Sequence, residues 1–147
     1  MTMLIENTLQ LLESSCAPEA MAVLDLDPSE LKETASILED YGIPFSRSIK
    51  LMALIALLAL ARKRHEDVSF SDEQLTRKIL DGDYFQSLYV QLAMQFDEMG
   101  LVRYLAPRLK KYYISQAMGK LSAEPLHDSL QAYLQAEQAA ARKEQAI

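Results

Sequence analysis

The sequence has few of the residues that mark several large protein classes. Only one of its 147 residues is cysteine, Cys16, and only four are glycine. A single cysteine excludes an internal disulfide and a cysteine-built metal site, and it predicts a reducing, cytoplasmic location. No GxGxxG or GKS/T motif is present, so phosphate-binding nucleotide folds have no support in the sequence.

Positive charge is also scarce over most of the chain. The net charge is −6, with −9 over residues 1–100 (8 Lys and Arg, 17 Asp and Glu) and +3 over residues 101–147 (7 against 4). The affinity of nucleic-acid binders comes mainly from basic groups on phosphates, so the acidic body argues against that class. The basic C-terminal third is interpreted as a solvated helix face, with an acidic partner or a diphosphate as the alternatives.

No apolar run is long enough to span a bilayer. The longest, Ile49–Ala61 (IKLMALIALLALA), is well short of the about 20 residues that a spanning helix needs. A helix that is apolar on all sides is either buried at the centre of a fold or shared with a partner. The three cations that follow it, Arg62, Lys63 and Arg64, allow at most peripheral membrane contact. The N-terminal residues MTMLIENTLQ are not typical of a signal peptide.

The composition and the periodicity predict one all-α domain over residues 1–147. Leu, Ala, Gln, Glu and Lys are abundant, and all of them favour helix. Asp27 with Glu30 predicts a capping box, and Gly42 predicts a helix end. Ser71 with Gln74 predicts a second capping box, Gly82 a bend or restart, Gly100 a helix end, and Pro107 a break or kink. The expected helices cover residues 4–14, 18–24, 28–41, 44–64, 71–80, 84–98, 101–121 and 126 onward, with fraying over about 138–147.

Acidic residues gather at two places where chemistry is conceivable. Asp81 and Asp83 flank Gly82, where two carboxylates can act as acid and base or bind Mg²⁺. Their i, i+2 spacing does not put them on one helical face, so helix capping is the favoured interpretation. The segment His65-Glu66-Asp67, with Asp72-Glu73 nearby, lacks an i, i+4 histidine pair and is interpreted as a solvated acidic loop.

A basic and aromatic step, Lys110-Lys111-Tyr112-Tyr113, has the residue types that clamp phosphates or stack on bases. On a helix, however, these four side chains point to different sides. We therefore expect the tyrosines in the core and the lysines in water.

The order of residues in the centre of the chain resembles a known family. Gly82-Asp83-Tyr84-Phe85 is followed by Leu88-Tyr89-Val90-Gln91-Leu92-Ala93 and then by Leu101–Leu109. This order resembles the small subunit, component I, of two-subunit medium- and long-chain polyprenyl diphosphate synthases. Catalytic relatives carry an Asp-rich DDxxD motif before the Gly-Asp step. This sequence has no Asp-Asp pair, and the second Asp-rich region of the family has no room after residue 121.

The resemblance implies a truncated isoprenoid-synthase fold and a noncatalytic role. The expected partner is a catalytic large subunit, in a heterodimer or a dimer of heterodimers. The complex would condense isopentenyl diphosphate with farnesyl diphosphate to hexaprenyl or heptaprenyl diphosphate for a quinone side chain, as in menaquinone biosynthesis. Mg²⁺ is expected on the partner, with no cofactor or metal bound by this chain and no nucleic acid. The alternative function is a helical adaptor without a link to catalysis.

The resemblance also suggests a surface that contacts the partner and completes an apolar elongation tunnel, with contact to the prenyl product left open. The candidate residues come from the apolar helix and from the Gly-Asp-Tyr helix. They are Leu54, Leu58, Gly82, Asp83, Tyr84, Phe85, Leu88, Tyr89, Leu92 and Phe96.

Overall fold

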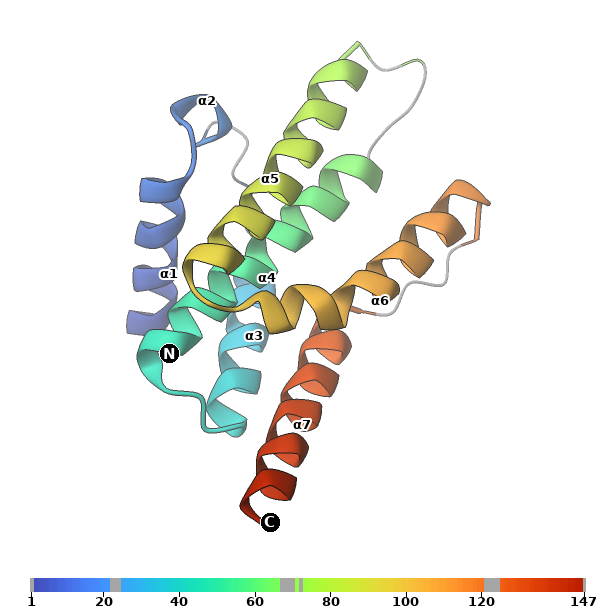
Figure 1. Ribbon diagram of the computed structural model, residues 1–147. Helices are drawn as coiled ribbons and strands as arrows, with labels where there is room; N and C mark the ends of the chain where they lie inside the picture. Colours follow the sequence, from blue (N-terminus) through green and yellow to red (C-terminus); the bar gives the residue numbers. More distant parts are fainter. Residues whose placement is uncertain (1, 22–24, 67–70, 72, 121–124, 147) are drawn as a thin grey trace. The chain divides into compact units, whose positions relative to one another are not determined.

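The computed structural model describes residues 2–21, 25–66, 71, 73–120 and 125–146, and all regular structure within them is helical (Figure 1). The all-α prediction is therefore confirmed. The helices are α1 (Thr2–Ser15), α2 (Pro18–Met21), α3 (Pro28–Asp40), α4 (Phe45–Glu66), α5 (Leu75–Gln95), α6 (Met99–Ala117) and α7 (Leu126–Gln145).

The chain divides into two compact units, where the sequence analysis expects one domain. The first unit, Met1–Glu98, contains α1 to α5, and the second, Met99–Ile147, contains α6 and α7. The boundary coincides with the change in charge, because residues 99 and 100 are uncharged. The first unit therefore carries −9 and the second +3.

Helix α4 is the centre of the first unit. It packs against α5, α1 and α3, and Figure 1 shows α4 and α5 side by side. All residues from Leu51 to Leu58 are buried, which agrees with the expectation of a buried central helix. An apolar run without a polar face is stable in water only when neighbours cover every side, and three helices do so here.

The start and the end of α3 follow local signals. Asp27 accepts hydrogen bonds from the Ser29 hydroxyl and backbone N–H, at 2.8 and 2.9 Å, and these bonds lower the pKa of its carboxyl group. Pro28 occupies the first helical position, as predicted. Gly42 follows the helix with φ of +66°, the left-handed conformation that glycine adopts without a steric penalty.

The predicted boundaries of α5 were wrong at both ends. The helix begins at Leu75, so its N-cap is Gln74, which makes no side-chain capping bond, and not Ser71 as predicted. At the other end, Asp97 has φ of 57° and turns the chain, so Gly100 is not the terminator and instead lies in α6. Aspartate tolerates the left-handed region better than most residues, so it can take the place of glycine at a helix end.

Two expected interruptions do not occur. Helix α5 runs without a break through Gly82, and α6 runs from Met99 to Ala117 with Pro107 inside it. A proline removes one backbone hydrogen bond, and a glycine weakens a helix by about 1 kcal/mol, so packing against other elements can outweigh either effect.

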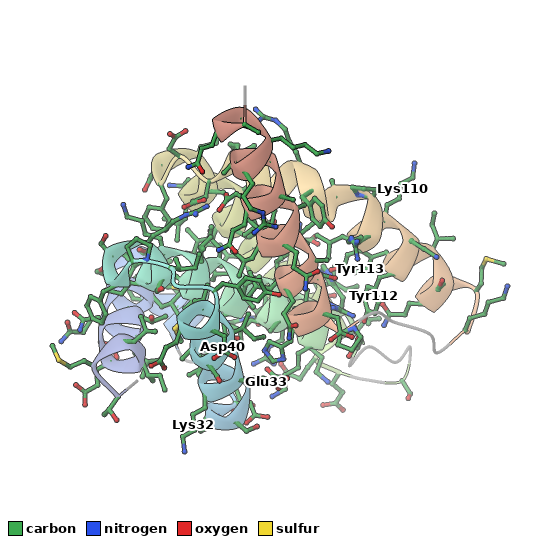
Figure 2. The ribbon with its side chains drawn as sticks, turned by 90° about the horizontal axis from the view of Figure 1, so that it is seen from below. Lys32, Glu33, Asp40, Lys110, Tyr112 and Tyr113 are labelled. Atoms are coloured by element: carbon green, nitrogen blue, oxygen red, sulfur yellow. The ribbon has the colours of Figure 1, made fainter. Side chains whose placement is uncertain are left out.

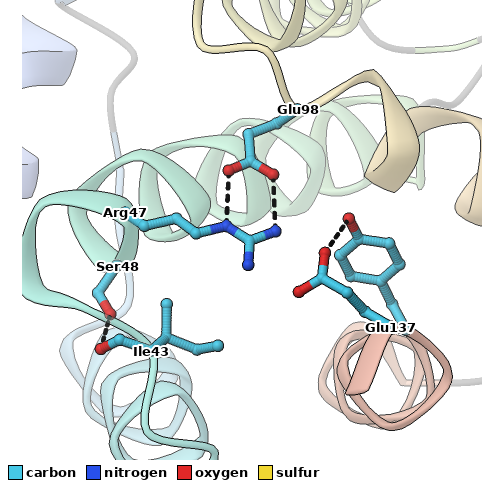
Figure 3. A network of polar contacts seen from close by, with 6 residues as sticks. Ile43, Arg47, Ser48, Glu98 and Glu137 are labelled. Atoms are coloured by element: carbon cyan, nitrogen blue, oxygen red, sulfur yellow. Dashed lines mark hydrogen bonds and ion pairs between the residues drawn. The ribbon is translucent and has the colours of Figure 1, made fainter. Parts of the chain in front are cut away.

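The second unit is a helix pair. Helix α6 packs against α7, and the rings of Tyr104 and Tyr133 lie 5.5 Å apart. A Cβ on Gly100 would lie 3.2 Å from the Tyr133 hydroxyl, which donates a 3.0 Å hydrogen bond to Glu137 (Figure 3). Leu130 and Leu134, which lie one turn apart on α7, are also buried. The helix continues to Gln145, beyond the point from which fraying is expected.

Candidate functional site

The Gly-Asp-Tyr step lies in the middle of α5 and is packed against the end of α4. A Cβ placed on Gly82 would collide with Cδ2 and Nε2 of the His65 imidazole. Glycine at this position leaves room for the imidazole ring where the two helices approach closely, and it does not break the helix. The sequence alone suggested a bend or restart of the helix, because it does not distinguish a glycine that starts a helix from one that makes room for a neighbouring ring.

His65 is held in this position by the first carboxylate after the glycine. Its Nε2 atom lies 3.0 Å from Oδ1 of Asp83, which joins the C-terminal turn of α4 to α5. The side chain of Asp83 is 63% exposed, against 21% for His65. Neither His65 nor Glu66 belongs to the loop predicted for them, because both lie in α4, while Asp67 and Asp72 lie outside the described residues.

Asp81 has a different partner from Asp83. The Nε atom of Arg77, one turn earlier on α5, donates to both carboxylate oxygens of Asp81, at 2.9 and 3.0 Å. The same guanidinium donates from Nη2 to the backbone carbonyl of Glu19, at 3.1 Å, and thereby links α5 to α2. Asp81 is buried, and the Arg77 contact supplies the opposite charge that a buried carboxylate needs.

Tyr84 completes the connection to the N-terminal helices. Its hydroxyl oxygen accepts a 2.7 Å hydrogen bond from the backbone N–H of Ala17, and its ring packs edge-on against Phe85 at 5.7 Å. Asp81, Asp83 and Tyr84 thus reach three different elements, α5 itself, α4 and the segment before α2. We call the five residues His65, Arg77, Asp81, Asp83 and Tyr84, with Gly82 between them, the α5 joint.

The chemistry of the α5 joint is that of a structural connection. Each carboxylate is engaged by its own cationic or imidazole partner, so the two aspartates are not arranged as an acid–base pair. The capping prediction for Asp81 and Asp83 was wrong, because both lie inside a continuous helix. Within the described residues, no group of three or more His, Cys, Asp or Glu side chains is placed to hold a metal ion.

Most of the predicted interface residues lie inside the first unit. Leu54, Leu58 and Phe85 are fully buried, with no exposed surface. Four other residues are buried as well: Gly82, Leu88, Tyr89 and Leu92. In the folded chain, these residues are packed among the helices of the first unit and offer no surface to a docking protein. Of the ten candidates only Asp83 is exposed, and Tyr84 and Phe96 are half-buried.

The exposed side of α5 carries residues that the sequence analysis did not single out. Ile79, Leu80 and Met94 are 41%, 59% and 60% exposed. They share one side of the helix with polar residues, since the helical spacing places all of them within about 120° of rotation. We call this surface the α5 outer face, and its residues are Ile79, Leu80, Asp83, Ser87, Gln91 and Met94. The sequence does contain a signal for this face. Ser87 and Gln91 form a polar stripe on the helix, and Met94 is an apolar residue beside that stripe.

Glu98, which the sequence pattern puts on the same polar stripe, is buried. Its two carboxylate oxygens accept hydrogen bonds from Nε and Nη2 of Arg47, at 2.8 and 3.0 Å (Figure 3). The ion pair spans 51 residues of sequence and joins the start of α4 to the turn after α5. A bidentate contact of this kind fixes both partners, and no local sequence pattern reveals it.

The structure also bears on the single cysteine and on the possibility of a membrane-spanning helix. Cys16 is buried, and this burial raises the pKa of its thiol, which opposes a nucleophilic role. The helices in the described ranges do not include one with the length and apolarity to cross a membrane.

Comparisons with known proteins add no relationship to this geometry. No family model, no curated protein and no solved structure matches the chain.

Proposed function

We propose that this chain is the noncatalytic small subunit of a two-component prenyl diphosphate synthase and acts in the cytoplasm. The observation that carries the proposal is the order of residues from Gly82-Asp83-Tyr84-Phe85 through Leu88–Ala93 to Leu101–Leu109, in a sequence without an Asp-Asp pair. The all-helical fold is compatible with that family resemblance.

The α5 joint supports a noncatalytic role. Metal-assisted ionisation of an allylic diphosphate needs carboxylates that are available to Mg²⁺. Asp81 instead neutralises Arg77, and Asp83 holds His65 in place. We therefore assign Mg²⁺ and both diphosphate substrates to the partner, and to this chain the stabilisation of that partner and an influence on product length.

The contact with the partner is proposed at the α5 outer face. The predicted contact residues Leu88, Tyr89 and Leu92 are buried in the chain's own core, whereas Leu80 and Met94 are exposed on the same helix. Exposed apolar side chains among short polar ones, as on this face, are typical of the centre of a protein interface. Asp83 is the one residue that belongs both to the predicted contact and to this face.

The alternative function, a helical adaptor without a link to catalysis, is also favoured by one observation. The Gly82-Asp83-Tyr84-Phe85 step has a complete structural explanation in the α5 joint, through His65, Ala17 and the core. Because the chain needs these four residues for its own packing, their presence is weaker support for a relationship to the prenyl synthase subunits. Both functions use an exposed surface, so they differ in the partner that is bound and in the activity that results.

The test is reconstitution. The chain is purified with its bound partners from the organism that encodes it, and condensation of isopentenyl with farnesyl diphosphate is assayed with Mg²⁺. We expect a prenyl synthase subunit to co-elute, with no activity from this chain alone and activity restored by mixing. Recovery of an unrelated protein and no condensation activity would instead establish the adaptor function.

A variant pair locates the contact. Leu80→Arg with Met94→Arg places two charges on the α5 outer face, and we expect partner binding and activity to fall more than tenfold. Met3→Arg is the matched control, because Met3 is 66% exposed on α1. If the Leu80→Arg, Met94→Arg variant binds the partner as tightly as the Met3→Arg control, and circular dichroism shows unchanged helicity for each, the α5 outer face is excluded as the contact.

A further inference from the structure

The stretch that contains α6 is basic and has no acidic residue. Between Met99 and Lys120 it carries five cations and neither aspartate nor glutamate, in a chain whose net charge is −6. The five cations are Arg103, Arg108, Lys110, Lys111 and Lys120. A helix surface that is solvated without a specific role usually mixes both signs of charge, so this segregation is a feature to explain.

The cations and the apolar residues of α6 are sorted by side. Leu101, Leu105 and Tyr112 are buried. Figure 2 shows Lys110 pointing away from Tyr112. The expectation for this step is confirmed for the two exposed lysines and for the buried Tyr112, whereas Tyr113 is only half-buried. The outward side is continuous, because its exposed members lie within about 100° of helical rotation. We call it the α6 basic face, and it consists of Arg103, Lys110, Lys111, Ile114 and Met118, all of them exposed.

Arg108 is not part of this face. Its guanidinium carbon lies 5.0 Å from the centroid of the Tyr104 ring, and its Nη2 atom donates a 3.1 Å hydrogen bond to the Tyr104 hydroxyl. The contrast shows that α6 contains two kinds of cation. One is folded onto an aromatic ring of its own helix, and the others extend into solvent beside two large apolar side chains.

Ile114 and Met118 are the second unusual feature of the α6 basic face. They are 50% and 63% exposed, and they stand one turn apart at the C-terminal end of the helix. The Met118 N–H donates to the Ile114 carbonyl at 3.1 Å, so the helical spacing continues to this point. Exposed apolar side chains flanked by lysines are the arrangement with which an amphipathic helix enters the boundary between lipid headgroups and acyl chains.

We propose that the α6 basic face binds an anionic lipid surface, with its cations on the headgroups and with Ile114 and Met118 inserted between them. A bilayer containing anionic lipid presents negative charge without a matching pattern of cations, and the lack of any acidic residue over the whole stretch complements such a surface. An acidic patch on a protein would also complement the cations, but exposed Ile114 and Met118 beside the lysines favour the headgroup boundary of a lipid surface.

A competing basic segment is less suitable. The sequence analysis places peripheral membrane contact at Arg62, Lys63 and Arg64. In the structure, the Lys63 ammonium group lies 2.6 Å from Oδ2 of Asp25, so part of this cluster is neutralised within the first unit. On the α6 basic face, by contrast, neither Lys110 nor Lys111 forms an ion pair with an acidic side chain of the part of the chain that the structure describes.

The attraction that we infer is moderate and depends on salt. Each lysine or arginine near an anionic bilayer contributes about fivefold to the partition coefficient, and the effect is screened within a Debye length of about 8 Å at physiological salt. The −9 charge of the first unit opposes binding to the same surface. The chain is therefore expected to bind reversibly to membranes rich in anionic lipid and to leave them at high salt.

The experiment is co-sedimentation of the full chain with large vesicles of phosphatidylcholine, with and without phosphatidylglycerol. We expect binding only to the anionic vesicles and loss of binding in high salt. Lys110→Glu with Lys111→Glu should lower the partition coefficient by at least about 25-fold. Arg142→Glu with Lys143→Glu makes the same change in charge at the exposed end of α7 and should lower it much less.

The apolar part of the face has its own variant. Ile114→Ser with Met118→Ser keeps the charge and should weaken binding while leaving its salt dependence in place. No binding to anionic vesicles, equal binding to neutral ones, or equal loss in the α6 and α7 charge variants would overturn the proposal. A salt-sensitive dimer without vesicle binding in sedimentation equilibrium would show that a second copy covers the face, and would overturn it as well.

This inference goes beyond the proposed function and does not depend on it. The vesicle assay uses this chain alone and needs no synthase partner. If the chain does not bind lipid, the condensation assay still tests the proposed function. If no synthase partner is found, the α6 variants still test lipid binding.

Discussion

Helices α4 and α6 are similar in length and in their mixture of apolar and basic residues, yet they have opposite surroundings. Helix α4 has 22 residues, of which 11 are buried, and α6 has 19, of which three are buried. In α4 the apolar residues form one run, with Arg47 and Lys50 before it and three cations after it. In α6 the cations lie between the apolar residues along the whole helix. The order of residues along the chain, more than their number, thus determines which helix becomes a core and which keeps an open surface.

The basic residues of the two helices illustrate the same difference. Arg47 at the start of α4 and Lys63 at its end both have acidic partners, Glu98 and Asp25. Lys110 and Lys111 of α6 are exposed, and Figure 2 shows Lys110 extending away from the helix. Helix α4 therefore uses two of its charges to close the first unit, whereas the exposed lysines of α6 belong to the face that we propose to bind lipid.

The largest effect that distinguishes the two helices should come from shortening a leucine or isoleucine. Leu58→Ala in α4 removes a fully buried side chain and should lower the free energy of unfolding by about 2–5 kcal/mol. Ile114→Ala in α6 removes a side chain that is 50% exposed and should change it by about 0.5 kcal/mol or less. Urea denaturation followed by circular dichroism measures both values. Similar losses in the two variants would mean that α6 is packed as closely as α4.

The next effect should come from the charges. Arg47→Met leaves the buried Glu98 carboxylate without its bidentate donor, and we expect a loss of about 1–3 kcal/mol. The guanidinium is partly exposed, so water replaces some of the lost interaction. Arg103→Met on the exposed side of α6 is the control and should be within about 0.5 kcal/mol of the parent. Adding Glu98→Gln to Arg47→Met should recover part of the loss, and no recovery would contradict the ion-pair explanation.

A smaller effect tests the α5 joint. Alanine in the middle of a helix is more stable than glycine by about 1 kcal/mol, but a Cβ at position 82 displaces the His65 ring. We expect Gly82→Ala to gain nothing in the parent protein and about 1 kcal/mol in a His65→Ala background. The double-mutant cycle in urea gives this coupling directly. An equal gain in both backgrounds would show that the ring does not press on Gly82.

The smallest effect concerns pH. Hydrogen bonds from Ser29 lower the pKa of Asp27 in the folded chain, so its capping interaction stabilises the fold above the unfolded pKa of about 4 and disappears as the pH falls through the folded value. Asp27→Ala should therefore lower the Tm at pH 7, and the two proteins should converge at acid pH as the Asp27 carboxyl group of the folded chain becomes protonated. A difference in Tm that stays constant over the whole acid titration would contradict this assignment.

How much was visible in the sequence depended on the distance over which each feature acts. The caps of α3, the buried run of α4 and the burial of Tyr112 in α6 were predicted, because each depends on residues within one or two turns. The role of Gly82 was missed because it depends on His65, and the burial of Glu98 was missed because it depends on Arg47. Periodicity shows which side of a helix is apolar, but not whether the chain itself or a partner covers that side.

The measurement that tests the central claim most directly is the condensation assay on the mixed proteins. This chain and the protein that co-purifies with it are assayed separately and together with farnesyl diphosphate, isopentenyl diphosphate and Mg²⁺. The account predicts no product from this chain alone, long prenyl diphosphates from the mixture, and strong loss with the Leu80→Arg, Met94→Arg variant. A mixture without prenyl product, or product from this chain by itself, would contradict it.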